Sequence, residues 1–203
     1  MMIRSFEAKD LEACYAISLA TGLAGGDASH LYRDPRLMGH IYIAPYALLE
    51  PTLTFVVEDR DGVAGFVAGI ADTAAWEDRL ERDWWPALRK TYADVSDAPS
   101  SLTPDQRRIR MIHHPARTPA TVVARYPAHL HMNLLPRLHR RGIGSRLFQT
   151  WHAAVTRRGA ATFHVGVNKE NTRAIPFWRS LTFKELRLDD VPEGRTLWMG
   201  RDN

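Results

Sequence analysis

The chain has 203 residues, of which 45% are hydrophobic and 25% are charged, a size and balance that suit one domain with a buried core. No run approaches the roughly 18–20 consecutive apolar residues that a membrane-spanning helix needs, so we expect no membrane partner. The single cysteine, Cys14, excludes an intramolecular disulfide. Because the N-terminus also lacks the apolar run of a secretory signal, we expect a cytoplasmic protein.

The net charge of +4 makes nucleic acid one class of partner to consider. The arginines are nevertheless scattered, no long basic tail exists, and the densest cluster stands beside glycines. A local anionic ligand explains that cluster more simply, so nucleic acid is not the expected partner.

The first 71 residues predict a strand, a helix and a hairpin. The strand is expected at 2–6. Apolar side chains then recur on one helical face between residues 11 and 19, and a glycine-rich segment ends that helix. The stretch 41–51 shows no clear period and is expected to be irregular. Residues 53–58 and 63–71 are rich in strand-forming types and flank an Asp-Gly turn, which predicts a hairpin.

The block at 72–125 differs in composition from the segments on either side. Residues 76–92 are charged and aromatic and predict a helix that is interrupted near Pro86. A loop rich in proline and serine follows at 97–103. Thr103 then marks a helix start, because proline follows it at the first helical position. We interpret the block as a helical insertion within a single domain spanning residues 1–203.

The last third is the most regular part of the chain. Its patterns predict a strand–helix–strand unit, whose two strands should be parallel, and a closing hairpin. With the earlier hairpin, this predicts an α/β (α+β) protein with a mixed central sheet flanked by helices. The expected elements are a strand at 128–135, a helix at 144–157, a strand at 161–167, a helix at 171–181 and strands near 183–188 and 196–201.

The turn at 136–145 reads Pro-Arg-Leu-His-Arg-Arg-Gly-Ile-Gly-Ser between a predicted strand and a predicted helix. The first amides of a helix have no partner within it and form an anion site. Gly142 and Gly144 let a phosphate approach the backbone, and Arg140 and Arg141 add positive charge. The turn therefore predicts a ligand with a pyrophosphate. No lysine follows the second glycine, which excludes a Walker A loop. The turn also lacks the third glycine of a dinucleotide-binding fingerprint.

These residues resemble two motifs of the GNAT superfamily. The strand and turn at 132–144 are similar to motif A, a strand followed by R/Q-x-x-G-x-G/A. Residues 171–183 are similar to motif B, N-x-x-A-I-x-F-Y-x-x-x-G-F. Three earlier segments, 46–51, 55–65 and 83–86, resemble the acetyltransferase-like C-terminal domain of O-GlcNAc hydrolase and its free-standing bacterial relatives. The resemblance implies a GNAT fold, with the helical insertion placed before the motif A strand.

The resemblance also implies a co-substrate and a reaction. The co-substrate would be acetyl-CoA, and its acetyl group would pass to an amine by direct attack in a ternary complex. Leu134 matches the strand position whose backbone pairs with pantetheine, and Asn171 matches the motif B asparagine near the pantetheine arm. Trp178 stands in the place of a tyrosine that often reprotonates the CoA thiolate. The positions that would hold the pyrophosphate are His139, Arg140, Arg141, Gly142, Ile143, Gly144 and Ser145.

Candidate acid–base residues lie on and just before the motif A strand. His129, His131 and Asn133 share one face of that strand, and histidine titrates near neutral pH, which suits removal of a proton from the acceptor. Asp72 ends the preceding strand and is a second candidate base or a site for a cationic acceptor. The alternatives are hydrogen bonding beneath the insertion for the histidines and helix capping for Asp72. No set of histidines has metal-ligand spacing, so no metal is expected.

Three functions remain open. The leading hypothesis is an N-acetyltransferase that acts on a small molecule or a protein amino group, with a hydroxyl acceptor as a variant. The alternative is a catalytically weak or inactive acetyl-CoA-binding domain, a pseudo-acetyltransferase used in sensing or interaction, because the indole of Trp178 is too weak an acid to replace the tyrosine. The third, nucleic-acid binding, rests on charge alone. A homodimer is also an open alternative, since edge strands of this fold often pair.

Overall fold

The computed structural model describes residues 1–95, 101–189 and 194–202. Within these ranges a seven-stranded sheet has the order β1-β2-β3-β4-β5-β7-β6. β4 and β5 are parallel, and all other neighbouring strands are antiparallel. The expected mixed sheet is therefore confirmed. The strands are β1 (Met2–Ser5), β2 (Thr54–Asp59), β3 (Gly62–Ile70), β4 (Ala128–Leu134), β5 (Thr162–Asn168), β6 (Lys184–Glu185) and β7 (Thr196–Asp202).

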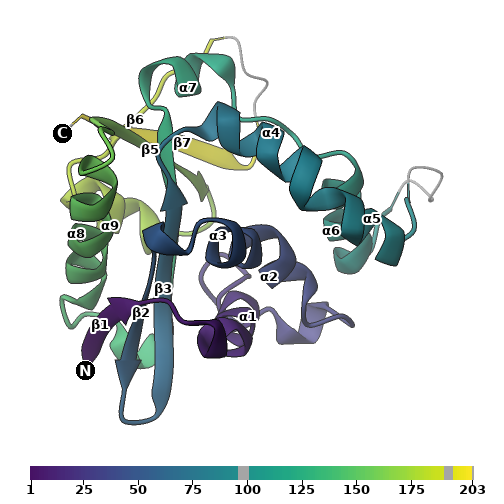
Figure 1. Ribbon diagram of the computed structural model, residues 1–203, viewed down its shortest axis with the longest axis horizontal. Helices are drawn as coiled ribbons and strands as arrows, with labels where there is room; N and C mark the ends of the chain where they lie inside the picture. Colours follow the sequence, from purple (N-terminus) through teal and green to yellow (C-terminus); the bar gives the residue numbers. More distant parts are fainter. Residues whose placement is uncertain (96–100, 190–193, 203) are drawn as a thin grey trace.

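Helices cover both faces of this sheet (Figure 1). α8 (Ile143–Thr156) and α9 (Ala174–Ser180) lie on one face, and α1 (Leu11–Ala20), α2 (Leu37–Tyr42) and α3 (Ala44–Leu49) lie on the other. The described residues between β3 and β4 form four further helices, α4 (Thr73–Asp83), α5 (Trp85–Thr91), α6 (Pro104–His113) and α7 (Ala120–Arg125). Of these, α6 packs beside α2, whereas α7 lies near one end of β5 (Figure 1).

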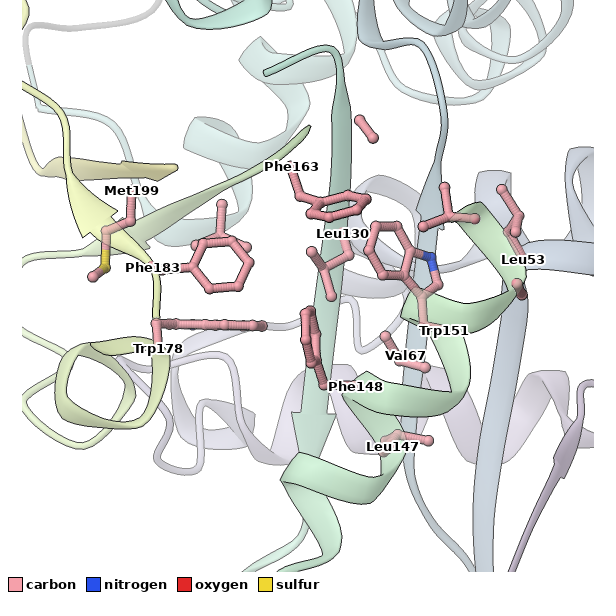
Figure 2. Packing of buried hydrophobic residues seen from close by; sticks show 14 of the residues in the cluster. Leu53, Val67, Leu130, Leu147, Phe148, Trp151, Phe163, Trp178, Phe183 and Met199 are labelled. Carbon is pink, nitrogen blue, oxygen red and sulfur yellow. The ribbon is translucent and has the colours of Figure 1, made fainter. Parts of the chain in front are cut away.

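The core has one cluster on each face of the sheet. On the α8 face, Leu147, Phe148 and Trp151 present the apolar side of the helix to Leu130 and Phe163 of the sheet (Figure 2). This is the helical face that the sequence pattern predicts. On the other face, α1, α3, α4, α5 and α6 contribute side chains to a second cluster. The block 72–125 is thus joined to the core through its aromatic residues.

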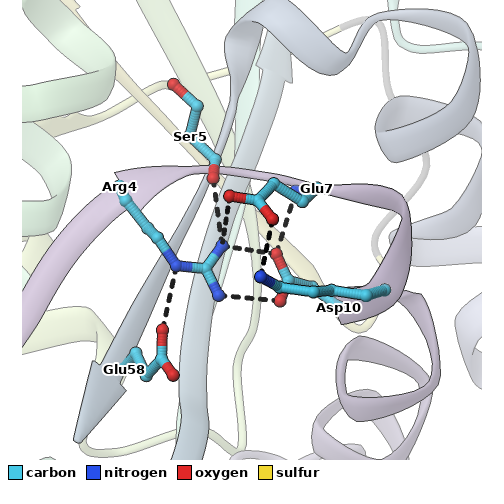
Figure 3. A network of polar contacts seen from close by, with 6 residues as sticks. Arg4, Ser5, Glu7, Asp10 and Glu58 are labelled. Atoms are coloured by element: carbon cyan, nitrogen blue, oxygen red, sulfur yellow. Dashed lines mark hydrogen bonds and ion pairs between the residues drawn. The ribbon is translucent and has the colours of Figure 1, made fainter.

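An ion-pair network joins the edge strand β1 to its neighbours (Figure 3). Arg4 donates two hydrogen bonds to Asp10, at 2.6 and 2.8 Å, and a third to Glu58 of β2 at 2.9 Å. Asp10 is only 3% exposed, and its hydrogen bonds from Arg4 lower the pKa of its carboxyl. The network fixes the N-terminus of α1 against the sheet, so α1 is held in place at its start.

The segment 41–51, expected to be irregular, lies largely in α2 and α3, so that expectation is wrong. Each helix has six residues, which is too short for a 3.6-residue period to emerge or for stability in isolation. Packing stabilises them instead. A Cβ added to Gly39 of α2 would lie 2.1 Å from the ring of Tyr15 in α1, so the two helices are in close contact.

Several other elements agree with the sequence patterns, although β6 covers only two residues of the strand expected near 183–188 and the patterns do not predict the helix α7. Asp61-Gly62 turns the β2–β3 hairpin, with Gly62 at a φ of +98°. Thr103 caps α6 in a capping box with Gln106, as the Thr-Pro start predicts. The helix over 76–92 is interrupted at Trp84, between α4 and α5. Of the predicted loop at 97–103, the first four residues lie outside the described ranges.

The parallel strands β4 and β5 separate soon after they meet. Their ladder contains two residue pairs, Ala128 with Phe163 and His129 with His164. Beyond His129, β4 continues for five residues to Leu134 without a ladder partner in β5. A wedge therefore opens between the two strands, with His129 and His164 at its apex and the turn into α8 at its wide end.

Candidate functional site

The turn at the wide end of the wedge has the geometry of an anion site. α8 begins at Ile143, and its N-cap, Gly142, has a φ of +70°, a left-handed conformation that favours glycine. A Cβ at Gly142 would meet nothing within 4 Å. The first intrahelical hydrogen bond at this end is donated by the amide of Arg146, to the carbonyl of Gly142. The preceding amides lack helical partners and are available to an anion.

The arginines of this turn divide into two kinds. Arg137 is bound to Asp59 at 2.9 Å, so its charge is already compensated and it is not free to bind a ligand. Arg140, Arg141 and Arg146 are exposed, and none of them has a carboxylate within 4.0 Å among the residues that the structure describes. Three uncompensated guanidinium groups therefore surround the open N-terminus of α8. This arrangement fits a pyrophosphate.

Gly144 has a packing role as well as its place in the turn. A Cβ there would lie 3.0 Å from the ring of Phe177 in α9 and 3.5 Å from Leu134. His139, which follows the short helical turn Pro136–Leu138, contacts the carbonyl oxygen of Leu134 through its Nε2, at 3.0 Å. The end of β4, the turn and α9 are thus held together by close contacts.

Asn171 lies in the loop between β5 and α9. Its Oδ1 accepts a hydrogen bond from the amide of Ala174, the first residue of α9, at 3.0 Å, although the N-cap position of that helix is Arg173. The same side chain lies against Gly25, in the segment after α1, and Arg173 donates to the carbonyl of Gly25 at 2.8 Å. Asn171 therefore connects the wedge to the segment that follows α1.

Of the remaining predicted binding residues, Ile143 is buried and Ser145 is partly buried in the first turn of α8. Both belong to the backbone that forms the cradle. Residues 139–145 therefore lie together from the turn after β4 into the first turn of α8, with Leu134 at the end of β4 and Asn171 in the loop between β5 and α9.

The histidines form a hydrogen-bonded chain at the apex of the wedge. The hydroxyl of Thr73 donates to the carbonyl of Pro127 at 2.6 Å and contacts Nδ1 of His129 at 2.8 Å. Nε2 of His129 lies 2.7 Å from the hydroxyl of Tyr46, and that hydroxyl lies 3.2 Å from Nε2 of His131.

The protons of this chain can be assigned in order. A hydroxyl carries one proton, and that of Thr73 is used on a carbonyl, so Nδ1 of His129 must donate to Thr73. Nε2 of neutral His129 then accepts from Tyr46, and the Tyr46 oxygen accepts from Nε2–H of His131. This leaves Nδ1 of His131 as the bare, basic nitrogen. It has no hydrogen-bond partner among the described residues and is not sealed in the interior.

Burial keeps the histidines neutral. It lowers the pKa of His131 to about 4, with a smaller contribution from the nearby charge of His164. Burial also lowers the pKa of His164 to about 4 and that of His129 well below its ordinary value. At neutral pH all three imidazoles are therefore uncharged.

Two other candidates have structural partners. Asp72 is exposed and caps α4 by accepting from the amide of Ala75 at 3.1 Å. Asn133 donates to the hydroxyl of Thr21 at 2.6 Å, and Thr21 donates to the carbonyl of Ile17. Asn133 therefore attaches β4 to the end of α1.

Trp178 lies inside the core on the α8 face. It is 6% exposed, and its ring meets those of Phe148, Phe177 and Phe183 edge to face at 5.1–6.2 Å. Its partners explain why a large aromatic side chain occupies this position in α9.

Sequence patterns do not reveal Tyr46 and Thr73 as parts of the histidine chain. Tyr46 is separated from His129 by 83 positions and lies in a helix that the pattern missed. Thr73 looks like an ordinary residue in the first turn of α4. Only the packing of α3 and α4 against the second core cluster brings both hydroxyls to His129.

The described residues contain no group of three or more His, Cys, Asp or Glu side chains arranged to hold a metal. None of the helices in the described ranges has the length and apolar content needed to cross a membrane.

Comparisons with known proteins place this geometry in a family. The crystal structure of SsHAT is 34% identical and superposes with a TM-score of 0.90, over 99% of this chain and 97% of that one. The crystal structure of Chaetomium thermophilum Naa20 in complex with a bisubstrate analogue shares the fold, at 17% identity and a TM-score of 0.55 over 100% and 86% of the two chains. No family model matches the chain.

Among curated proteins, Protein O-GlcNAcase of Rattus norvegicus and of Mus musculus is 19% identical over 162 residues. The match covers 79% of this chain but only 18% of the length of those proteins. The chain thus spans about a fifth of the length of these curated proteins, and the match agrees with the resemblance to O-GlcNAc hydrolase seen in the sequence. Further solved structures with this fold are an acetyltransferase and an N-acetyltransferase from Staphylococcus aureus Mu50. With its wedged parallel strands and the anion cradle at α8, the chain belongs to the GNAT superfamily of acetyltransferases.

Proposed function

We propose that the chain is an acetyl-CoA-dependent N-acetyltransferase that transfers an acetyl group to an amine by direct attack in a ternary complex. The observation that carries this proposal is the hydrogen-bonded chain that ends at the basic Nδ1 of His131, beside the wedge. We also propose that residues 72–125 form an insertion within a single domain and cover the side of the site where the acceptor binds.

The residues at the wide end of the wedge would hold the co-substrate. The amides of Ile143 to Ser145 and the free guanidinium groups of Arg140 and Arg141 suit its pyrophosphate. The backbone of β4 from Leu130 to Leu134 lacks a ladder partner on the β5 side, which suits hydrogen bonds to the pantetheine arm. When bound, the co-substrate supplies an acetyl thioester.

His131 would act as the general base. Its Nδ1 takes a proton from the acceptor amine as the nitrogen attacks the thioester carbon and the C–S bond breaks. The proton on its Nε2 is held by Tyr46, so only Nδ1 can accept. The released thiolate needs a proton, which protonated His131 or a water molecule supplies, because the indole of Trp178 is buried and is too weak an acid.

Replacing His131 by Asn tests this assignment. We expect kcat to fall by about 10²-fold, the lower range for general-base catalysis, while acetyl-CoA still raises the melting temperature. Saturation by a hundredfold excess over Kd stabilises a protein by about 2.7 kcal/mol, roughly 5–10 °C for a chain of this size. Thiol release is the turnover measurement. Cys14 will not obscure it, since burial raises the pKa of that thiol to about 12.

Asp72→Asn is the matched variant. Asparagine caps a helix as well as aspartate, so α4 is preserved while the carboxylate is removed. Unchanged turnover in Asp72→Asn with a large loss in His131→Asn supports His131. The reverse pattern makes Asp72 the base. If acetyl-CoA does not raise the melting temperature of the folded wild-type protein, the proposed function is wrong.

A catalytically inactive acetyl-CoA-binding domain is the second candidate. Its specific support is the buried position of Trp178, which provides no acidic group at the wedge. Thermal stabilisation by acetyl-CoA without thiol release across a broad amine panel would favour this candidate.

A further inference from the structure

The protein has a second group of arginines without carboxylate partners. Other arginines, such as Arg36 and Arg89, lie 2.8–2.9 Å from a carboxylate. Among the residues that the structure describes, Arg107, Arg108 and Arg110 of α6 have no carboxylate within 4.0 Å. The first unpaired group stands at the anion cradle of α8. The second stands on the opposite face of the sheet, where α6 lies with α2 (Figure 1).

These three arginines border an open cavity of about 470 Å³. The rest of the lining consists of Leu102 before α6, Met111 in α6, His114 directly after it, and Arg195 before β7. Two of the basic groups are already compensated, because Arg195 binds Glu170 at 2.9 Å and His114 binds Asp94 at 3.0 Å. The uncompensated positive charge therefore comes from α6.

Arg108 is the most confined of the three. Its Nε donates to the hydroxyl of Tyr32 and its Nη1 to the hydroxyl of Tyr42, both at 2.9 Å, and Nη1 also contacts Met111. Nη2 has no hydrogen-bond partner among the described residues. A partly buried guanidinium that contacts only neutral groups lacks the anion that normally accompanies it.

Tyr42 connects this arginine to the proposed base. One edge of its ring faces the His131 imidazole, with centroids 5.6 Å apart, and the Cζ of Arg108 lies 5.5 Å from the centroid of the same ring. Tyr42 therefore lies between the proposed base and Arg108. An acceptor that extends from His131 past Tyr42 would bring its far end to the positive charge of Arg108.

We infer that the acetyl acceptor carries an acidic group, a carboxylate or a phosphate, which binds Arg108 at the mouth of the α6 cavity. Arginine suits both anions because its planar group donates two parallel hydrogen bonds. Arg107 and Arg110, both exposed at the rim, attract such an acceptor and repel a cationic one. The inference rests on the proposed acetyltransferase function and names its substrate class.

The test compares amines that differ only in the acidic group. Butylamine, 4-aminobutyrate and putrescine form one set, and ethanolamine with O-phosphoethanolamine forms a second, so the two sets separate carboxylate from phosphate. Thiol release gives kcat and KM, and calorimetric titration of the acids into the CoA-bound protein gives binding directly. Each measurement is repeated in Arg108→Gln and in Arg110→Gln. Arg110 is exposed, so its replacement removes a positive charge without disturbing the packing of α6.

We expect kcat/KM for one acidic amine to exceed that of its neutral analogue at least tenfold. Arg108→Gln should raise KM for the acid at least tenfold with little change in kcat, and Arg110→Gln should raise it by a smaller factor. Arg60→Gln is the control for the loss of one positive charge, since Arg60 is in the β2–β3 turn and its side chain is 92% exposed. It should leave both constants unchanged.

Equal or better turnover of neutral or cationic amines overturns the inference and leaves the acetyltransferase function intact. An unchanged KM for acids in both α6 variants overturns it as well. If no amine releases thiol, the proposed function fails. Calorimetry then shows whether α6 forms an anion site. Binding of an acid that Arg110→Gln weakens and Arg60→Gln does not supports an anion site at α6, whereas no binding overturns it.

Discussion

At the scale of single residues, the direction of a hydrogen-bonded chain decides which nitrogen is basic. Thr73, His129 and Tyr46 do not reach the open part of the wedge, but their protons determine the tautomer of His131. Histidine alone has two neutral forms, and only the form with a bare Nδ1 presents a base to the acceptor. The chain therefore makes Tyr46 a positioning residue.

Tyr46→Phe tests this role. The variant loses the acceptor for Nε2–H of His131, so the other tautomer becomes accessible and we expect kcat to fall by about tenfold, less than loss of a base costs. We expect KM for the acceptor and the affinity for acetyl-CoA to stay at their wild-type values. Steady-state thiol release and the thermal shift measure these quantities.

Tyr15→Phe is the control for removal of a buried hydroxyl. Tyr15 also pairs with an imidazole, Nδ1 of His40, at 2.8 Å, but it lies between α1 and α2. Both variants should lose about 1 kcal/mol of stability, the typical contribution of one hydrogen bond. Equal kcat values in the two variants would show that Tyr46 acts only through stability.

At the scale of elements, glycine is needed for different physical reasons at the two glycine positions of the α8 turn. Gly142 has a left-handed backbone and open space around it, whereas a Cβ at Gly144 would meet Phe177 of α9 at 3.0 Å. The sequence motif treats both as openings for a phosphate. In the fold, Gly144 also sets how closely α8 and α9 approach.

Gly144→Ala should therefore destabilise the protein through α9. We expect a loss of about 1–3 kcal/mol, as for overpacking elsewhere, read from urea unfolding without ligand. Phe177→Leu should relieve part of this loss in the double variant, because the two sites are in contact. Gly142→Ala should cost about 1–2 kcal/mol through backbone strain, and Phe177→Leu should not relieve it. Additive losses for residues 144 and 177 would contradict the packing explanation.

The elements that could be predicted are those whose signal is local. The β2–β3 hairpin, α8 and the capping box of α6 each follow from turn residues, a long apolar face or capping types. α2 and α3 could not be predicted, since their stability comes from contacts with α1 and the sheet. The same holds for the candidate site. The cradle is contiguous in sequence. Tyr46 contacts His131, and Arg108 contacts the neighbouring Tyr42, only after α3 and α6 have packed.

At the scale of the whole molecule, the sheet separates two regions of uncompensated positive charge. One surrounds the N-terminus of α8 and the other lies on α6, and the wedge between β4 and β5 stands between them. Part of the positive charge of a protein with a net charge of +4 is thus concentrated in two local groups. This distribution favours two anionic ligands over a nucleic acid.

The histidines at the apex of the wedge also make the stability of the molecule depend on pH. In the unfolded chain their pKa values return to about 6.5. In the folded protein burial lowers those of His131 and His164 to about 4 and that of His129 well below its ordinary value. Between pH 6.5 and 4 the unfolded state binds more protons. The free energy of unfolding therefore falls as the pH falls, by up to about 1.4 kcal/mol per pH unit for each histidine.

Urea unfolding at pH 7.5, 6.5, 5.5 and 5.0 measures this dependence, and His164→Asn isolates one of its sources. The asparagine amide can still donate to the carbonyl of Tyr126, which Nδ1 of His164 contacts at 2.5 Å, but it does not titrate. The variant should lose stability less steeply below pH 6.5, by about one proton. Asp10, whose pKa lies below the ordinary 3.8, does not contribute in this range. Equal slopes in the two proteins would mean that His164 is protonated as readily in the folded chain as in the unfolded one, and that the apex of the wedge admits water.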